Sequence, residues 1–396
     1  MSNKEKTLNM SYKYDVCIVG GLGHIGLPLG IVFASKGLNV CLQDINEEHA
    51  KIVSEGNLPF VEYEAQPLLE KALEDKKLSI SLDPTSISEA KNIIIAIGTP
   101  VDEYMNSKTR QFLEFISSLK KHLNEDQLVI IRSSVAPNTC EQIRRTLGDN
   151  IKLSYCPERI VQGYAITELK KLPQLVAGFS KEAVEEASEL FRNISSSIIE
   201  TSMQEAELAK LFANSWRYIQ FAIANQFFMI CEDQNVDYNK VRSVMVEGYE
   251  RASQLPSAGF AAGPCLLKDT MQISSFYQGG FHLGQSAMMV NEGLPNFIVN
   301  QLKAKYELHD RKVGILGMSF KADVDDIRDS LSFRLSKILK FNGAEVYCSD
   351  EFASSDNFIS KEELISKSET IIIGAPHKTY DELEIPSDVD FVNIWK

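Results

Sequence analysis

Short apolar runs alternate with amphipathic stretches along roughly the first half of the chain. The runs are rich in β-branched side chains and predict buried strands, and the helical patterns between them are long enough for crossover connections. The expected strands cover residues 15–19, 39–43, 78–81, 92–96, 128–131 and 152–155. This alternation is typical of an α/β domain built on a mainly parallel sheet.

The pattern changes near residue 200. The stretch from Met203 to Asp233 contains neither glycine nor proline. It predicts one helix of about thirty residues, about 45 Å long at 1.5 Å per residue. Apolar residues occur around most of its circumference, so we expect the helix to be buried between lobes or against a second subunit.

From Lys312 the opening pattern returns. A strand over 312–316 ends in a glycine, a helix is expected over 331–340, and a strand over 344–348 leads to Asp350. The first lobe has the same order and reaches Asp44. We therefore expect two Rossmann-like lobes with parallel sheets, joined by a central helical domain that contains the long helix. The expected boundaries are 1–200, 201–300 and 301–396.

Composition narrows the class of protein. The 396 residues carry a net charge of −13, which disfavours nucleic acid as a partner because phosphate-binding surfaces are basic. The seven cysteines are scattered and form no Cys-x-x-Cys pair, so we expect neither a disulfide framework nor a metal site. The polar start and the lack of a long apolar run predict a reduced, cytoplasmic protein with no membrane partner.

The segment Gly21-Leu22-Gly23-His24-Ile25-Gly26 fits the G-x-G-x-x-G pattern between a strand and a helix. Glycines permit a tight turn and close approach of the backbone to a pyrophosphate, and the helix start supplies free N–H groups. Asp44 stands eighteen residues after Gly26, where a carboxylate can accept hydrogen bonds from ribose hydroxyls. The same carboxylate would repel a 2′-phosphate, so the pattern favours NAD over NADP. The alternative is a glycine-rich turn followed by a surface aspartate.

The long helix carries a narrow polar stripe. Lys210, Asn214, Arg217 and Asn225 fall within roughly 80° of one another at about 100° per residue. A polar stripe on a buried helix is costly unless its members have partners, so it indicates a cleft for a charged or hydroxylated ligand. A solvated face is the alternative.

Cys265 is the second candidate for chemistry. It follows Gly259 and Gly263, small residues that let a ligand approach the backbone, and Lys268 and Asp269 come after it. Cationic surroundings or a helix start would lower the pKa of a thiol and make it a nucleophile. A buried, inert cysteine is the alternative reading.

Taken together, five segments resemble the nucleotide-sugar 6-dehydrogenases, the UDP-glucose/GDP-mannose dehydrogenase family. They are the glycine turn 21–26, Tyr155-Cys156-Pro157-Glu158-Arg159, residues 205–214 with Asn225, residues 259–269, and residues 320–330. Five separated motifs in the right order are far more specific than any one of them. The Pro-Glu-Arg run looks more like the UDP-N-acetylhexosamine (ManNAc or GlcNAc) dehydrogenases than like the UDP-glucose enzymes.

The resemblance implies a four-electron oxidation of a sugar C6 alcohol to a uronate, in surface polysaccharide biosynthesis. The thiol of Cys265 would hold the aldehyde as a thiohemiacetal and then as a thioester. Lys210 would stabilise the reacting oxygen or move its proton, and Asn214 would orient it. Glu158 and Asp269 would handle water and protons during hydrolysis.

The resemblance also assigns binding residues. NAD would contact Gly21, Gly23, His24, Ile25, Gly26, Asp44, Thr99, Ser134 and Arg328. The UDP-sugar would contact Glu158, Arg159, Lys210, Asn214, Arg251, Gly259 and Lys321. On residue pattern alone, Thr99 and Ser134 follow expected strands, where ligands gather in open α/β sheets but where simple turns are as common.

Three alternatives stay open at this point. The substrate could be UDP-glucose in place of an N-acetylhexosamine. The chain could be a two-electron β-hydroxyacid-type dehydrogenase, which needs no cysteine, or a nucleotide-sugar-binding protein without turnover. The apolar helix predicts a homodimer or a higher homo-oligomer. The resemblance implies that Arg251 contacts the substrate, in some family members the substrate of the neighbouring subunit.

Overall fold

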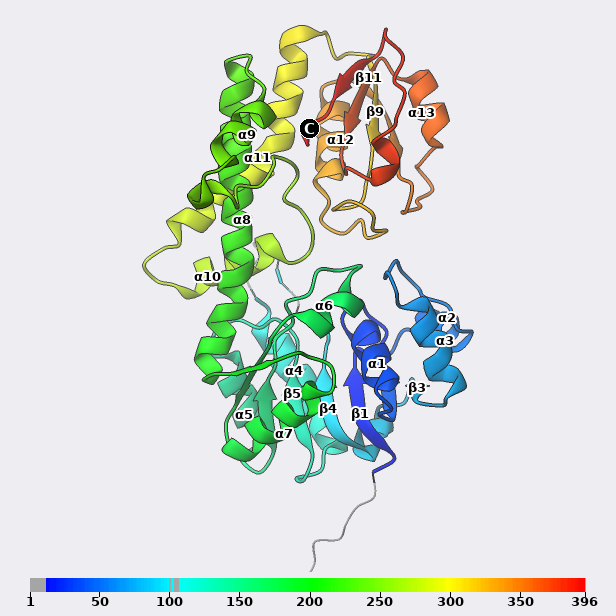
Figure 1. Cartoon of the computed structure of the whole chain (residues 1–396), viewed down its shortest axis with the longest axis vertical. Helices are drawn as coiled ribbons and strands as arrows, with labels where there is room; N and C mark the ends of the chain where they lie inside the picture. Colours follow the sequence, from blue (N-terminus) through cyan, green and yellow to red (C-terminus); the bar gives the residue numbers. More distant parts are fainter. Residues whose placement is uncertain (1–11, 100, 103–106, 396) are drawn as a thin grey trace, which may run out of the picture. The chain divides into compact units, whose positions relative to one another are not determined.

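The computed structural model of the protein describes residues 12–99, 101–102 and 107–395 (Figure 1). The described residues form two compact units, one extending to Lys210 and the other beginning at Leu211. The first unit contains an eight-stranded sheet and the second a four-stranded sheet. The α/β class expected from the sequence, with two sheets and a helical region that contains a long helix, is confirmed.

The sheet of the first unit has the strand order β3-β2-β1-β4-β5-β6-β7-β8. Its strands are β1 (Tyr14–Val19), β2 (Val40–Gln43), β3 (Leu78–Ser81), β4 (Ala90–Ile95), β5 (Leu128–Ile131), β6 (Lys152–Tyr155), β7 (Gln174–Gly178) and β8 (Ile198–Glu200). All neighbouring pairs are parallel except β6 and β7, which run antiparallel. The order reverses between β1 and β4, and ligands of open α/β sheets bind at such a switch point.

Helices cover both faces of this sheet, because side chains of a strand alternate between its two faces. One face packs against α1 (Gly26–Ser35), α2 (Glu47–Ser54), α3 (Gln66–Glu74), α6 (Ala165–Lys171) and α7 (Lys181–Arg192). The other packs against α4 (Thr109–Leu119) and α5 (Thr139–Leu147). Figure 1 shows these helices around the sheet. The strands are therefore buried on both sides, which explains their continuous apolar sequence.

The long helix α8 runs from Met203 to Asp233, as the sequence predicts. The helices that follow it are α9 (Tyr238–Val246), α10 (Leu266–Phe276) and α11 (His282–Lys305). Several apolar side chains of α8 are exposed: Phe212 is 51%, Trp216 57% and Ile230 52% accessible. These side chains are not covered within the single chain, and the expectation that a second subunit covers them stays a prediction.

The second sheet is parallel, in the order β10-β9-β11-β12. Its strands are β9 (Lys312–Leu316), β10 (Glu345–Ser349), β11 (Thr370–Ile373) and β12 (Asp390–Val392). Helices α11 and α12 (Leu331–Phe341) contribute to the core on one face, and α13 (Lys361–Lys367) to the core on the other. Trp395, which follows β12, contacts both cores.

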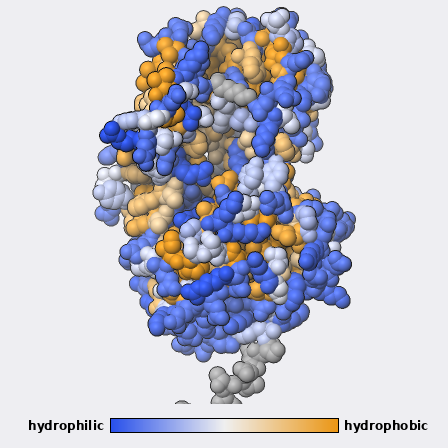
Figure 2. Space-filling view, in the orientation of Figure 1, coloured by the Kyte–Doolittle hydropathy of each residue, from blue (hydrophilic) through white to orange (hydrophobic). Residues whose placement is uncertain are grey.

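No described helix is long and apolar enough to cross a membrane. Within the described ranges, no three His, Cys, Asp or Glu side chains gather as a set that could hold a metal ion. Figure 2 shows apolar residues reaching the surface among hydrophilic ones on the face drawn.

Candidate active site

The glycine turn joins β1 to α1 and is held by close backbone packing. A Cβ atom on Gly26 would lie 2.3 Å from the carbonyl oxygen of Gly20, and one on Gly21 would lie 2.7 Å from Cα of Leu42. A Cβ on Gly23 would meet nothing closer than 3.7 Å. Gly21 and Gly26 are therefore required by packing, whereas Gly23 leaves an open approach to the turn, as a pyrophosphate needs.

Asp44 follows β2 and its carboxylate faces the glycine turn. It accepts hydrogen bonds from the N–H groups of Leu22 (2.9 Å), Ile45 (2.8 Å) and Asn46 (3.1 Å). A carboxylate can accept about four hydrogen bonds. The half-buried Asp44 thus retains capacity for a hydroxyl donor, so the residues present fit the ribose of a dinucleotide.

His24 lies inside the glycine turn, and its side chain packs against neighbouring residues of the same lobe. Its ring packs against that of Phe60 in a tilted arrangement with centroids 4.0 Å apart, and its Nδ1 lies 3.0 Å from Nε2 of Gln162. Thr99 follows β4 and lines a small recess with the start of α4, and the half-buried Ser134 follows β5. Both positions are at the carboxyl edge of the sheet, as the sequence predicts.

Glu158, predicted to be catalytic, lies in a buried ion pair with Arg132. Its other carboxylate oxygen accepts hydrogen bonds from the N–H groups of Arg159 and Ile160. Arg132 is 1% exposed and also donates to the Cys156 carbonyl oxygen at 3.0 Å. In this arrangement Glu158 neutralises a buried guanidinium and shapes the loop after β6, and a catalytic role for it stays a prediction.

Arg159, predicted to contact substrate, donates from its guanidinium to the carbonyl oxygen of Pro173. Burial lowers the pKa of Arg159, with the Glu158 charge acting in the opposite direction. Its guanidinium is thus held by the protein backbone in this structure, and a substrate contact would require it to exchange that partner.

The polar stripe of α8 has members in both units. Lys210, the last residue of the first unit, is 7% exposed. In the second unit Asn214 donates from Nδ2 to Oδ2 of Asp269 at 2.6 Å. Asp269 is fully buried, and its Oδ1 has no partner among the described atoms. A buried carboxylate oxygen without a partner fits a site for a water molecule or a ligand donor.

Asn225 continues the stripe and is fully buried. Its Nδ2 donates to the carbonyl oxygen of Gly259 at 3.0 Å, and its Oδ1 accepts from the Gly259 N–H at 2.8 Å. Nδ2 also lies 2.9 Å from Oδ1 of Asn291, whose own amide donates to the Tyr218 carbonyl oxygen at 3.0 Å. For Asn214 and Asn225 the stripe is therefore a partnered set rather than a solvated face, whereas Arg217 is exposed.

Cys265 is exposed and immediately precedes α10. Its carbonyl oxygen accepts from the Asp269 N–H at 2.9 Å, which forms the first turn of the helix. The thiol therefore stands at a helix start, where the helix dipole favours a thiolate. Cys265 is therefore not a buried cysteine, and its reactivity stays a prediction.

The other cysteines differ from Cys265. Cys231 is half-buried and the remaining five are buried. Burial raises the pKa of the Cys156 thiol to about 12, and it also raises the pKa of Cys348. Cys265 is the exposed thiol of the seven, which makes it the candidate nucleophile.

The loop before Cys265 packs against the loop between β9 and α12. The N–H of Gly263 donates to the Asp329 carbonyl oxygen at 3.3 Å, and a Cβ on Gly263 would lie 2.5 Å from the Phe320 ring. Arg328 forms a bidentate pair with Asp326. Asp326 raises the pKa of Arg328, and the charge of Cys265 acts in the same direction. A guanidinium within electrostatic reach of the thiol would favour its ionised form.

Two predicted substrate residues lie apart from these contacts. Arg251 is exposed and its guanidinium lies over the Tyr249 ring, 4.9 Å from the centroid. Lys321 is half-buried on the loop before α12, and its carbonyl oxygen accepts from the Ser319 hydroxyl at 3.0 Å. Their roles in substrate binding stay predictions.

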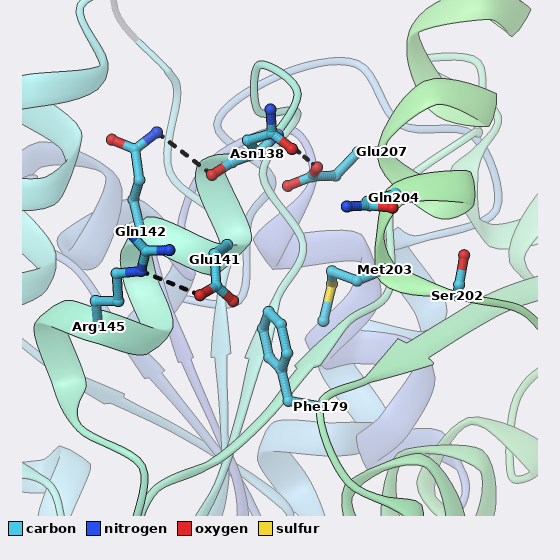
Figure 3. A pocket seen from close by; sticks show the side chains of 9 residues that line it. All are labelled: Asn138, Glu141, Gln142, Arg145, Phe179, Ser202, Met203, Gln204 and Glu207. Atoms are coloured by element: carbon cyan, nitrogen blue, oxygen red, sulfur yellow. Dashed lines mark hydrogen bonds and ion pairs between the residues drawn. The ribbon is translucent and has the colours of Figure 1, made fainter.

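A cavity of about 820 Å³ lies between α5 and the start of α8, with Phe179 and Met203 beside it (Figure 3). None of the predicted site residues lines it. Its carboxylates are already partnered, since Glu207 accepts from the N–H groups of Asn138 and Cys140 and Glu141 pairs with Arg145. We do not assign a ligand to it.

Sequence patterns did not identify several residues that shape the site. Arg132 forms an ion pair with Glu158, and Asn291 accepts a hydrogen bond from Asn225. Trp395 lies against Gly259. Ile45, next to Asp44, is 89% exposed and offers an apolar surface beside the turn. The only signal in the sequence was the unusual place of Arg132, a charged residue directly after a buried strand.

The glycine turn, the acid after β2 and the parallel sheet define a dinucleotide-binding fold. Three segments match the UDP-glucose/GDP-mannose dehydrogenase family: residues 14–195 its NAD binding domain, 204–292 its central domain and 314–394 its UDP binding domain. The chain belongs to the UDP-glucose/GDP-mannose dehydrogenase family. It is thus an NAD-binding oxidoreductase, as the sequence predicts, and its UDP binding domain implies a UDP-sugar substrate.

The chain is 28% identical over 353 residues to a UDP-N-acetyl-D-mannosamine dehydrogenase of Methanococcus maripaludis, covering 86% of this chain and 81% of the relative. It is similar to the solved UDP-N-acetyl-mannosamine dehydrogenase of Staphylococcus aureus, with a TM-score of 0.84, 25% identity and coverage of 96% and 98%. A UDP-glucose dehydrogenase of Pyrobaculum islandicum shares the fold, with a TM-score of 0.89, 22% identity and coverage of 99% and 96%.

Proposed function

We propose that the protein oxidises the C6 alcohol of a UDP-sugar to a carboxylate in two steps. The alcohol loses a hydride and a proton and becomes an aldehyde. The thiolate of Cys265 then adds to the carbonyl carbon, and the resulting thiohemiacetal loses a second hydride and becomes a thioester. Water cleaves the C–S bond, which gives the uronate and frees the thiol. Two NAD⁺ are reduced for each sugar and one water is consumed.

One observation carries this proposal: an exposed thiol stands at the start of α10, one helical turn before a buried carboxylate, one oxygen of which has no partner among the described residues. An aldehyde does not readily give up a hydride until a nucleophile makes its carbon tetrahedral, and a thiolate does so while leaving a hydrolysable ester. A two-electron hydroxyacid dehydrogenase needs no such thiol. Membership of a nucleotide-sugar dehydrogenase family supports the same choice.

Asp269 and Asn214 would act together. Asn214 donates to one oxygen of Asp269, which leaves Oδ1 able to accept from a water or a substrate hydroxyl. Lys210 would stabilise the reacting oxygen of the sugar or take part in moving its proton. Glu158 would contribute to hydrolysis, for which its contacts with Arg132 would have to loosen.

NAD supplies the acceptor for both hydrides when it is bound. The glycine turn with His24 and Ile25 would hold the pyrophosphate, and Asp44 would accept from the adenosine ribose. Thr99 and Ser134, at the carboxyl edge of the sheet, would line the nicotinamide side, and Arg328 would contact the cofactor from the loop before α12. The open approach at Gly23 and the spare acceptor of Asp44 support this placement.

The favoured substrate is a UDP-N-acetylhexosamine, either the ManNAc or the GlcNAc isomer, in the biosynthesis of a surface polysaccharide. The support is the Pro157-Glu158-Arg159 run and the names of similar proteins, which are UDP-N-acetyl-D-mannosamine dehydrogenases. Arg159, Arg251, Gly259 and Lys321 would bind it together with the catalytic side chains. UDP-glucose is the second candidate, since a UDP-glucose dehydrogenase shares the fold.

A panel assay tests the substrate. The protein is incubated with NAD and separately with UDP-N-acetylmannosamine, UDP-N-acetylglucosamine, UDP-glucose and GDP-mannose, and NADH is followed by absorbance. We expect an N-acetylhexosamine to give the highest kcat/KM. A higher value with UDP-glucose would transfer the assignment to the second candidate, and no NADH with any of them would favour a binding protein without turnover.

We also propose a homodimer formed through α8. Phe212, Trp216, Ile223, Phe227 and Ile230 are exposed and, at 100° per residue, lie within about 60° of one another, roughly opposite the polar stripe. A continuous apolar stripe on a 31-residue helix is typical of a helix that packs against a partner.

Light scattering after size exclusion tests the dimer. The unaltered protein should have twice the mass of one chain, and Trp216→Glu should shift it toward the monomer. Phe341→Glu, at a 91% exposed position on α12, is the matched control and should leave the mass unchanged. A fully active monomer at micromolar concentration would contradict both the dimer and any contribution of Arg251 across the interface.

A further inference from the structure

Trp395 lies directly over Gly259, at the start of the loop that leads to Cys265. A Cβ atom on Gly259 would be 2.2 Å from ring carbons of Trp395, so the indole occupies the space that a side chain would need. The φ of Gly259 is +150°, a backbone conformation that favours glycine. The loop can therefore follow this path only because residue 259 has no side chain and the ring covers it.

The backbone of Gly259 is also fixed by hydrogen bonds to a side chain of α8. Asn225 pairs with both its N–H and its carbonyl oxygen, and Asn291 holds Asn225 in turn. Asn225 and Asn291 are both fully buried. The peptide at Gly259 is thus enclosed between an asparagine of α8 and the indole that follows β12.

The indole is itself anchored to the second sheet. Its Nε1 donates to the Ile373 carbonyl oxygen at the end of β11, at 3.3 Å, and its backbone N–H donates to Oδ1 of Asn393 at 3.0 Å. Its ring also packs edge-on against Phe260, with centroids 6.5 Å apart. The position of Trp395 is therefore set in part by hydrogen bonds outside the loop that it covers.

A second aromatic ring holds the same loop nearer the thiol. Phe320 lies against Gly263, which also donates its N–H to Asp329. Two aromatic contacts thus define the course of residues 259–263, and Cys265 follows two residues later. A thiolate that must reach a carbonyl carbon needs placement within about 3–3.5 Å, and an error of about 1 Å can cost about 100-fold in rate.

We propose that Trp395 is a positioning residue for the thiol of Cys265, acting by clamping Gly259 against Asn225. The inference rests on the proposed function for its catalytic consequence, because only the second oxidation requires the thiol. Loss of the indole should therefore slow the second oxidation and leave the first nearly intact. A general loss of folding would reduce both steps alike.

The experiment compares Trp395→Ala, Trp395→Phe and the matched control Phe391→Ala, which removes an exposed ring from β12. With the UDP-sugar that the panel selects, Trp395→Ala should lower the rate of uronate formation about 10–100-fold. The first NADH per sugar should form within about threefold of the normal rate, and aldehyde should be captured by hydroxylamine. Trp395→Phe should restore most of the second step. Equal loss of both steps, or no loss of either, would overturn the proposal.

Hydrogen–deuterium exchange on the chain without substrate gives a readout that does not depend on activity. Trp395→Ala should speed exchange of the Gly259 N–H and its neighbours while β9 and β11 stay protected. Unchanged protection at Gly259 would overturn the clamp even if Cys265 is catalytic. Faster exchange in Trp395→Ala together with a Cys265→Ser protein that still makes uronate would instead refute the proposed function. If Trp395→Ala does not fold, Trp395→Leu, which keeps an apolar side chain but no ring over Gly259, replaces it and should give the same split between the steps.

Discussion

The two sheets begin with the same order of elements, yet their first loops present different chemistry. In the first lobe six residues separate β1 from α1, and they form a tight turn of backbone amides. In the second lobe fourteen residues separate β9 from α12, and they carry Phe320, Lys321 and Arg328. The first loop is suited to hold a pyrophosphate by N–H groups, whereas the second presents aromatic and charged side chains.

The aspartates that follow the second strand of each lobe also differ, in their burial and in the number of hydrogen bonds that they accept. Asp44 is half-buried and accepts three hydrogen bonds from N–H groups. Asp350 has a fully buried side chain and accepts from four N–H groups, with the ring of His377 3.1 Å away. Asp44 thus retains the capacity to accept a hydrogen bond from a ligand, whereas the hydrogen-bonding capacity of Asp350 is used within its own lobe. The two aspartates therefore have equivalent positions in their lobes but different roles. The number of N–H groups of the protein that donate to each carboxylate determines whether it can still accept from a ligand.

The largest expected effect is on stability at Asp350. Asp350→Ala would leave four partly buried N–H groups without their acceptor and remove the carboxylate beside His377, so we expect the free energy of unfolding to fall by about 3–5 kcal/mol. Urea denaturation of this lobe measures it. NAD affinity should stay within about threefold, and a loss of stability below about 1 kcal/mol would show that the two aspartates are equivalent.

Substitution of Asp44 should mainly weaken the binding of NAD. Asp44→Ala removes the acceptor for the ribose hydroxyls, so we expect the Kd for NAD to rise about 10–100-fold, equivalent to about 1.4–2.7 kcal/mol. Calorimetry or fluorescence titration measures it. The Asp350→Ala protein is the control, and equal losses of NAD affinity in both would contradict the assignment.

Acid should destabilise the second lobe through Asp350. Burial by itself raises the pKa of Asp350, but hydrogen bonds from His377 and from the N–H groups of Phe352 and Ala353 lower it to about 2. A carboxyl group whose pKa is depressed on folding stabilises the fold above its unfolded value near 4, and that contribution is lost as the pH falls toward 2. We expect a loss of about 2 kcal/mol over this window. Chemical denaturation at several pH values measures it, and Asp350→Asn should remove this part of the pH dependence.

The smallest effect is expected at Gly23. Because a Cβ there would lie 3.7 Å from its nearest neighbour, Gly23→Ala should change the free energy of unfolding by less than about 1 kcal/mol. It should still weaken NAD binding by narrowing the approach to the turn. Gly26→Ala is the matched comparison, since its Cβ would lie 2.3 Å from the Gly20 carbonyl oxygen and should destabilise the lobe. Equal stability losses in the two variants, by thermal melting, would contradict the different roles.

Local pattern was enough for most of the fold. The limits of α8 and of several strands follow from periodicity, glycine and β-branching, which act over a few residues. Strands β7, β8, β11 and β12 were not predicted. The antiparallel pairing of β7 with β6 in particular depends on contacts between distant segments. The sequence predicted that α8 is apolar but not which of its apolar residues stay exposed in the single chain, because a sequence does not show which neighbour covers a residue.

The candidate site divides in the same way. The glycine turn, Asp44 and Cys265 stand in local patterns with a chemical reason for each residue. The clamp on Gly259 joins it to Asn225, 34 positions earlier, and to Trp395, more than 130 positions later, and no local pattern predicts either contact. The pairing of Glu158 with Arg132 is of the same kind, and it shows how an acid singled out for chemistry can also neutralise a buried cation.

Counting NADH per molecule of sugar tests the thiol chemistry most directly. With a limiting amount of the active UDP-sugar and excess NAD, the unaltered protein should form two NADH and one uronate per sugar. The Cys265→Ser protein should form at most one NADH and release aldehyde that hydroxylamine captures. Two NADH per sugar from Cys265→Ser at an unchanged rate, or a single NADH from the unaltered protein, would contradict the account.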